Sequence, residues 1–409
     1  MTHLCRVGCV NSMSEAYDSS VRPCEICGSC SAKVLHRQSF LFPGLAEPVH
    51  YDVVTCRACG FCYASDIPDQ SALNQFYQAV DHHVHAELPP GLARIHGEFF
   101  RFVRGHASLA SDARILDIGS GMGHFLHHFQ KAGFTDLQGM EPSLAAAELA
   151  RNTYSLNVHS ASVDTFVASE RFDLASLCGV LEHIADLRRS MESISALLRD
   201  DGYLFIAVPD ASSFGQVVPA EPFLEFALEH INFFSATSLD NLLRACGFEK
   251  VIVASQHNDF YDNNYLLALY RRVAQPSLAI VSDSEAAPSL RVYVDLSRQG
   301  LRPVEAVAKQ LVASQEPLLI WGAGALTSRL LCDTCLGQAN ICGVIDRNRR
   351  LQGKELLNTL ITAPDSIGNY QGATVFIAST TYSAEIRETL LQRYAWTGRI
   401  ITLASGATS

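Results

Sequence analysis

Residues 115–126 read ILDIGSGMGHFL, and this stretch predicts a strand that turns sharply into a helix. The apolar run ends in glycines at positions 119, 121 and 123, and helical periodicity follows in Phe125 to Lys131. Glycines at alternate positions permit a tight turn and leave peptide N–H groups open to a ligand, while the start of a helix favours a carboxylate. The stretch therefore predicts a strand–turn–helix unit with a ligand at its turn.

Strand and helix patterns alternate on both sides of this turn. The expected strands are Leu137–Met140, Phe172–Leu177, Tyr203–Val208, Lys250–Val253 and Tyr265–Tyr270, and the expected helices are Ser143–Thr153, Arg188–Leu198 and Ser238–Cys246. Such alternation predicts a parallel, doubly wound sheet. The same theme returns on a smaller scale after the helical pattern of Leu290–Ala313, where Leu318–Trp321 precedes the turn GAGALTSRL.

These patterns, together with two C-x-x-C pairs near the N-terminus that are typical of zinc ligands, predict an α/β protein with a Rossmann-like central domain, a small N-terminal zinc-binding module and a smaller C-terminal Rossmann-like domain. A chain of 409 residues exceeds what one hydrophobic core usually organises, which agrees with several domains. The expected divisions are a flexible tail at 1–20, the zinc-binding module at 21–85, the central domain at 86–275, a linker and helix at 276–315, and the C-terminal domain at 316–409.

Charge and hydropathy indicate the class of partner. The net charge of −11 disfavours a nucleic-acid groove or an anionic membrane surface and favours a small-molecule partner. No apolar run reaches the roughly 18 residues of a membrane-spanning helix, and the first twenty residues lack the apolar stretch of a signal peptide, so we expect a cytoplasmic location. No feature of the sequence sets the oligomeric state.

Two C-x-x-C pairs stand in the N-terminal region, in CEICGSC and CRACGFC. Four thiolates that converge tetrahedrally bind Zn²⁺ and hold together a module too small to be stable by apolar burial alone. Such a site is coordinatively closed, so its role is structural. The alternatives are core cysteines, or an iron–sulfur cluster that also uses Cys30 or Cys62. The predicted zinc ligands are Cys24, Cys27, Cys56 and Cys59.

An acidic residue follows the glycine turn at the spacing of a nucleoside site. Glu141, in MEPS, ends the next predicted strand, where a carboxylate accepts hydrogen bonds from both hydroxyls of a ribose. Asp164, in SVDTF, adds a polar group where an adenine amino group donates. The alternative is an NAD site, but its G-x-G-x-x-G consensus is not met, since the spacing here is G-x-G-x-G.

Four ordered motifs, DIGSGMG, MEPS, FDLASLCGVLEHIAD and LLRDDGYLFIAVPD, resemble those of the class I S-adenosylmethionine-dependent methyltransferases. The resemblance implies a Rossmann-like seven-stranded methyltransferase domain. It also implies S-adenosylmethionine as methyl donor, with Glu141 on its ribose, residues 162–165 near its adenine and the glycine loop at its methionine moiety. The predicted donor-binding residues are Asp117, Gly119, Ser120, Gly121, Gly123, Glu141, Pro142, Asp164 and Cys178.

A later segment, EFALEHINFFSATSLDNLLRACGFE, contains Glu229 and His230 before an aromatic stretch. A histidine is suited to removing a proton near neutral pH, and an adjacent carboxylate can orient it; a structural histidine on a loop is the alternative. His183, in VLEHI, either lines the donor pocket or belongs with Glu182 to the start of a helix.

With the cysteine pairs and the rear GAG…VIDRNRRLQGKEL unit, this segment resembles the zinc-containing sugar C-methyltransferases of deoxysugar biosynthesis. The resemblance implies catalytic roles for His230 as base and for Glu229, and His183 completes the predicted catalytic residues. This chain departs from the family pattern at Ala227, where the family has a tyrosine, and in the rear unit at LLNTL and STTYS.

The function expected from these motifs is methylation of a small molecule, with His230 taking a proton from a nucleotide-linked keto-sugar or a related intermediate and carbon as the acceptor atom. O- or N-methylation of another metabolite, a non-methylating use of the donor and a non-catalytic binding protein are the alternatives.

Overall fold

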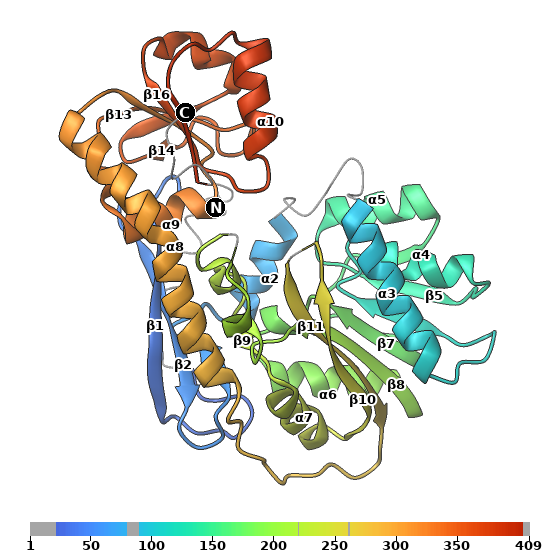
Figure 1. Ribbon diagram of the computed structural model, residues 1–409. Helices are drawn as coiled ribbons and strands as arrows, with labels where there is room; N and C mark the ends of the chain where they lie inside the picture. The colour runs from blue at the N-terminus through green and yellow to red at the C-terminus, as the bar shows by residue number, and fades with distance from the viewer. Residues whose placement is uncertain (1–21, 80–89, 220, 261, 404–409) are drawn as a thin grey trace, which may run out of the picture.

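A computed structural model describes residues 22–79, 90–219, 221–260 and 262–403 (Figure 1). The tail expected at 1–20 lies outside the described residues. Within them the chain forms three sheets, and Figure 1 shows the central domain beside the N-terminal strands, with the C-terminal domain at the far end of helix α8 (Ala286–Ser314).

The central sheet has the strand order β10-β11-β8-β7-β4-β5-β6, so the expected seven-stranded sheet is confirmed. Its strands are β4 (Ile115–Ile118), β5 (Leu137–Met140), β6 (Asn157–His159), β7 (Phe172–Cys178), β8 (Leu198–Pro209), β10 (Phe248–Asn258) and β11 (Asn263–Arg272). The pairs from β6 to β8 are parallel, but β11 runs antiparallel to both β8 and β10. The expectation of an entirely parallel sheet is wrong at this edge, because β10 and β11 are joined by a short connection that only an antiparallel pair permits.

Helices cover both faces of this sheet because its strands are apolar on both sides. Phe205 packs in one core with Phe99 and Phe125, whereas its neighbour Ile206 packs in the opposite core with Met191. The helices are α3 (Pro90–His106), α4 (His124–Lys131), α5 (Leu144–Tyr154), α6 (Leu187–Leu197) and α7 (Ala236–Ala245). This arrangement leaves the carboxyl ends of the parallel strands uncovered.

The N-terminal sheet is antiparallel, with the order β1-β2-β3-β9. Its members are β1 (Ala32–Phe40), β2 (Val49–Cys56), β3 (Cys62–Ala64) and β9 (Asn232–Phe233), and helix α2 (Gln70–Ala79) follows it. Strand β9 comes from the segment between the central β8 and α7, so residues far apart in the sequence complete one sheet. The segment that carries His230 is therefore tied to the N-terminal module.

The C-terminal domain has a six-stranded sheet with the order β14-β15-β13-β12-β16-β17. Its elements are β12 (Leu318–Trp321), α9 (Ala325–Asp333), β13 (Ile341–Ile345), β14 (Glu355–Leu356), β15 (Thr359–Thr362), β16 (Thr374–Ile377), α10 (Ser383–Glu388), the π-helix Thr389–Arg393 and β17 (Ile400–Thr402). Leu41 of the N-terminal segment packs into its core, and the Leu41 amide donates to the Ser328 carbonyl (3.0 Å).

Short 3-10 turns occupy several connections. They are η1 (Leu181–His183), η2 (Phe214–Gln216), η3 (Leu224–Phe226), η4 (Cys335–Gln338) and η5 (Pro364–Tyr370). Helix α8 begins four residues before the expected Leu290 and runs beside the blue N-terminal strands in Figure 1. No helix in the described part of the chain has the length and apolarity of a membrane span.

Candidate active site

A cavity of about 670 Å³ lies at the carboxyl ends of the central parallel strands. It is lined by residues that follow β4, β5 and β7, by Gln70 and Asn74 of α2, by the segment that contains His230, and by Thr381 and Tyr382 of the C-terminal domain. Ligands of open α/β sheets bind at this edge, where the loops after the strands converge. All three parts of the molecule therefore contribute to one site.

The glycine turn forms one half of the cavity. Gly119 and Gly121 have φ of 69° and 51°, values that glycine adopts without strain. A Cβ atom at Gly119 would approach Val180 Cγ2 to 2.5 Å, so the close passage of the next loop also requires glycine there. The Gly121 amide donates to Glu141 Oε2 (2.8 Å), and the Ser143 amide donates to Glu141 Oε1 (2.8 Å). The acidic residue at the end of β5 is thereby fixed against the turn.

The buried Asp117 near the end of β4 and the partly buried Cys178 at the end of β7 line the same half. Ser176 Oγ donates to Asp117 Oδ1 (2.7 Å). Burial, reinforced by the nearby charge of Glu141, raises the pKa of Asp117 to about 7. Burial also raises the pKa of the Cys178 thiol, which therefore stays protonated at neutral pH.

The structure brings eight of the nine predicted donor-binding residues to the cavity wall. They are Asp117, Gly119, Ser120, Gly121, Glu141, Pro142, Asp164 and Cys178. Gly123 stands outside this set of lining residues: a Cβ atom there would meet Leu156 Cδ1 at 2.6 Å, so its observed role is close packing of the turn against the segment after α5.

His183 and Glu182 lie on the turn η1, directly after β7. His183 Nδ1 donates to the Glu229 carbonyl oxygen (2.8 Å), because a carbonyl only accepts, and in the neutral ring Nε2 then carries the lone pair. Glu182 is 2% exposed, with Oε1 3.8 Å from His183 Nε2. Burial raises the pKa of Glu182 to about 8. A buried acid thus stands beside an oriented histidine on the cavity wall.

His230 faces His183 across this half, with ring centroids 5.0 Å apart. The carboxylate nearest to His230 in the ion pairs of the described residues is that of Glu225 on the turn η3, with Oε2 3.7 Å from His230 Nδ1. Asn263 Nδ2 donates to Glu225 Oε1 (2.7 Å). Burial raises the pKa of Glu225, opposed by His230 and by the Asn263 hydrogen bond. The sequence motif contained Glu225 but singled out Glu229, the carboxylate next to His230 along the chain.

Residues of the N-terminal module hold the turn that carries Glu182 and His183. Asn232 Nδ2, from β9, donates to the carbonyl oxygens of Ile184 (2.7 Å) and Leu181 (3.2 Å). The Arg22 guanidinium donates to Asn232 Oδ1 (2.9 Å) and to the Ala185 carbonyl (2.6 Å). The position of the predicted catalytic histidine thus depends on Asn232 and on Arg22, which is 163 residues from Ala185 in sequence.

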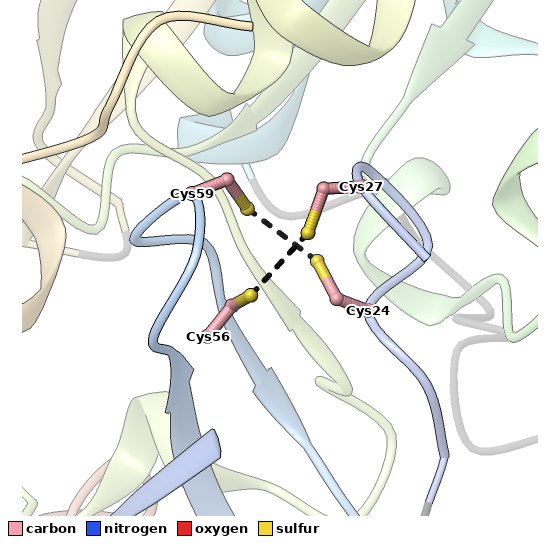
Figure 2. A group of neighbouring side chains, drawn as sticks. All are labelled: Cys24, Cys27, Cys56 and Cys59. Carbon is pink, nitrogen blue, oxygen red and sulfur yellow. Dashed lines mark hydrogen bonds between the residues drawn. The ribbon is translucent and has the colours of Figure 1, made fainter. Parts of the chain in front are cut away.

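The four predicted zinc ligands converge at the base of the N-terminal module (Figure 2). Cys24 Sγ lies 3.5 Å from Cys59 Sγ, Cys27 Sγ lies 3.4 Å from Cys56 Sγ, and the four sulfur atoms lie within 4.8 Å of one another. Zn–S bonds of about 2.3 Å in a tetrahedron place sulfurs about 3.8 Å apart, so the group fits a zinc ion.

The other two cysteines of these motifs lie apart from the converging sulfurs. Among the described residues, neither Cys30 nor Cys62 belongs to a group of side chains close enough together to hold a metal ion. Cys30 is exposed, and Cys62 is buried in the N-terminal sheet, where its Sγ donates to the Gly60 carbonyl (3.6 Å).

Comparisons with known proteins identify the central domain. Residues 80–253 match a family model described as a methyltransferase domain, and residues 314–401 match one described as C2185-like, N-terminal. The ubiquinone biosynthesis O-methyltransferase of Actinobacillus pleuropneumoniae is 30% identical over 105 residues, which are 23% of this chain and 44% of that protein. The chain thus spans less than half the length of these relatives.

Two further similarities differ in extent. C-methyltransferase NovU of Streptomyces niveus is 23% identical over 353 residues, which cover 82% of this chain and 81% of that protein. The crystal structure of Burkholderia thailandensis 1,6-didemethyltoxoflavin-N1-methyltransferase has 18% identity and a TM-score of 0.41, covering 57% of this chain and 99% of that one.

The central domain is a class I S-adenosylmethionine-dependent methyltransferase domain, as its motifs predict and the matched family model confirms. Along most of its length, the chain resembles the sugar C-methyltransferases, a resemblance supported by the extended match to NovU.

Proposed function

We propose that this protein transfers the methyl group of S-adenosylmethionine to a small-molecule acceptor. The observation that carries the proposal is the meeting of two half-sites in one cavity: the glycine turn with Glu141 on one side, and His183 with His230 on the other. Its volume of about 670 Å³ is within the range of small-molecule sites. A donor and an acceptor group have room to approach each other there.

The proposed donor half uses the residues that line the wall beside β4 and β5. The methionine moiety packs against the Gly119 to Gly123 turn at the start of α4, Glu141 accepts from the ribose hydroxyls, and Asp164 accepts from the adenine amino group. The bound sulfonium supplies an already activated methyl group, so the protein has to align the acceptor, exclude water and remove a proton.

We propose His230 as the base that removes this proton. For a carbon acid beside a ketone, His230 takes the proton and the resulting enolate carbon attacks the methyl group; the extended similarity to a C-methyltransferase favours this reaction. The similarity to ubiquinone biosynthesis O-methyltransferases supports a second candidate, in which His230 deprotonates a hydroxyl group and oxygen accepts the methyl.

A nucleotide-linked keto-sugar is the proposed acceptor class, and the charges restrict how it can bind. No Lys or Arg is among the described residues that line the cavity, whereas Glu182 and Glu225 are. The phosphates of the acceptor would be repelled by these carboxylates, so we place them near the exposed Tyr382, whose ring lies 4.5 Å from the Arg347 guanidinium. The uncharged sugar then lies at the histidines. Ala227 also lines the cavity, so the tyrosine of the family pattern is replaced by open space for the acceptor.

We further propose that the Cys₄ group holds a structural zinc ion. The support is the convergence of four sulfurs next to the contacts that fix the catalytic turn: the Arg188 guanidinium, at the start of α6, donates to the carbonyl oxygens of Glu25 (2.7 Å) and Ile26 within the first cysteine pair. Zinc would add four ligand bonds that hold the two cysteine pairs together. The cytoplasmic location remains a prediction from the sequence.

The test is methyl transfer from a radiolabelled donor to a panel of nucleotide-linked keto-sugars, phenols and a total metabolite extract. We expect labelled product with the wild-type chain and with the surface control His50→Asn, and loss of product with His230→Asn while S-adenosylhomocysteine still binds in calorimetry. Full transfer by His230→Asn would contradict the role of the base. Absence of labelled product from every source, with the donor bound, would favour a non-catalytic binding protein.

A further inference from the structure

We propose that Glu225, and not the adjacent Glu229, is the carboxylate that positions His230 for proton transfer. The inference rests on the proposed role of His230 as base. It assigns to Glu225 the task of holding the proton on His230 Nδ1, which leaves Nε2 to accept the proton of the acceptor. Glu225 is a positioning residue in this proposal, since it acts through the histidine.

The geometry around Glu225 directs one oxygen to His230. Glu225 is 7% exposed, and Oε1 is already occupied by the Asn263 hydrogen bond (2.7 Å). Its Oε2 has no hydrogen-bond partner within the described residues, and His230 Nδ1 lies 3.7 Å away. A buried carboxylate oxygen without a partner is costly, and a small approach of the imidazole N–H would satisfy it.

The turn that carries Glu225 is held rigidly from helix α8. The Glu225 amide donates to the Tyr293 hydroxyl (2.9 Å), and the Phe223 amide donates to Ser297 Oγ (3.1 Å). Tyr293 and Ser297 are both buried on α8. The carboxylate is therefore placed by hydrogen bonds from a helix outside the methyltransferase sheet.

The backbone of Glu229 contacts His183. Its carbonyl oxygen accepts from His183 Nδ1 (2.8 Å), so its backbone orients the other histidine. This backbone contact survives any change of the Glu229 side chain. Glu225 and Glu229 thus form a matched pair for a test: the same residue type, four positions apart, both lining the cavity.

The proposed step moves one proton to His230 and one methyl group to the acceptor. As the acceptor C–H or O–H bond breaks, its proton passes to His230 Nε2 and its electron pair forms the bond to the methyl carbon, while the S–C electron pair returns to sulfur. The imidazole becomes an imidazolium with N–H on both nitrogens. The Glu225 carboxylate stabilises that positive charge in a buried setting and does not itself take the proton.

The experiment uses full-length protein with ¹⁵N-labelled histidine and bound S-adenosylhomocysteine, so no acceptor is needed. Ring ¹⁵N shifts of His230, assigned with His230→Asn, report which nitrogen carries the proton. We expect the Nδ1–H form in the wild type and in Glu229→Gln, and a mixture of both forms in Glu225→Gln. With an acceptor found in the transfer assay, we expect Glu225→Gln to lower kcat by about 100-fold and to change the pH–rate profile, within the range for disturbed acid–base catalysis.

A second variant guards against a folding defect. Tyr293→Phe removes the hydrogen bond that holds the Glu225 amide, lies outside the main cavity, and should shift the tautomer in the same direction by a smaller amount. An unchanged Nδ1–H form in both Glu225→Gln and Tyr293→Phe, or a shift in Glu229→Gln alone, would overturn the assignment of Glu225. Full methyl transfer by His230→Asn would instead overturn the proposed base, so the two failures are distinguishable.

Discussion

Replacing Glu141 by glutamine should weaken donor binding about 30-fold without unfolding the protein. Both carboxylate oxygens of Glu141 face the turn, accepting from the Gly121 and Ser143 amides at 2.8 Å each, and each oxygen keeps a lone pair for a ribose hydroxyl. A hydrogen bond to a charged acceptor contributes about 1 kcal/mol more than one to a neutral acceptor. Two ribose hydroxyls therefore account for about 2 kcal/mol, and 1.4 kcal/mol is a tenfold change in Kd.

The assay is isothermal calorimetry with S-adenosylhomocysteine, which needs no acceptor. Glu148→Gln, on the exposed side of α5, is the matched control and should bind as the wild type does. Thermal unfolding of the ligand-free variants shows whether the turn itself is intact. Equal affinity of Glu141→Gln and wild type, with both folded, would refute the placement of the ribose at Glu141.

Two further outcomes follow from the buried groups. Chelation, or the substitution Cys27→Ser, should remove zinc, as measured by elemental analysis. Either change should also lower the melting temperature, because metal binding contributes to the free energy of folding. An unchanged zinc content and melting temperature in Cys27→Ser would count against a Cys₄ site. Burial raises the pKa of Glu182 from 4.5 to about 8, so between these pH values the folded protein holds a proton that the unfolded chain has lost. The contribution of Glu182 to the free energy of unfolding is therefore complete below about pH 4.5 and declines as the pH rises towards 8. Urea unfolding at about pH 5 and about pH 8 should show that Glu182→Gln gains stability relative to wild type as the pH rises, and a constant difference would contradict this.

Local patterns in the sequence were sufficient for the strand–turn–helix unit at Gly119 and for its acidic partner. Glycine geometry and the alternation of apolar segments are properties of short stretches, so they survive without knowledge of the fold. The clustering of four cysteines followed from their spacing, whereas the seventh strand, β6, was expected only from the family resemblance. The reversed edge strand β11 was not readable, because its direction depends on pairing with β8, more than 50 residues away.

The carboxylate that lies beside His230 could not be predicted from its neighbours in the sequence. The motif placed Glu229 beside His230 along the chain, but the 3-10 turn and the support from Tyr293 on α8 bring Glu225 to the imidazole. Likewise, Arg22, 163 residues from Ala185 in sequence, and Asn232, 48 residues from Ile184, fix the turn of His183. The sequence alone determined the glycine turn, the residue types of the site and the spacing of the metal ligands. Tertiary packing decided which carboxylate lies beside His230, because that depends on distances in space, which neighbours along a chain do not set.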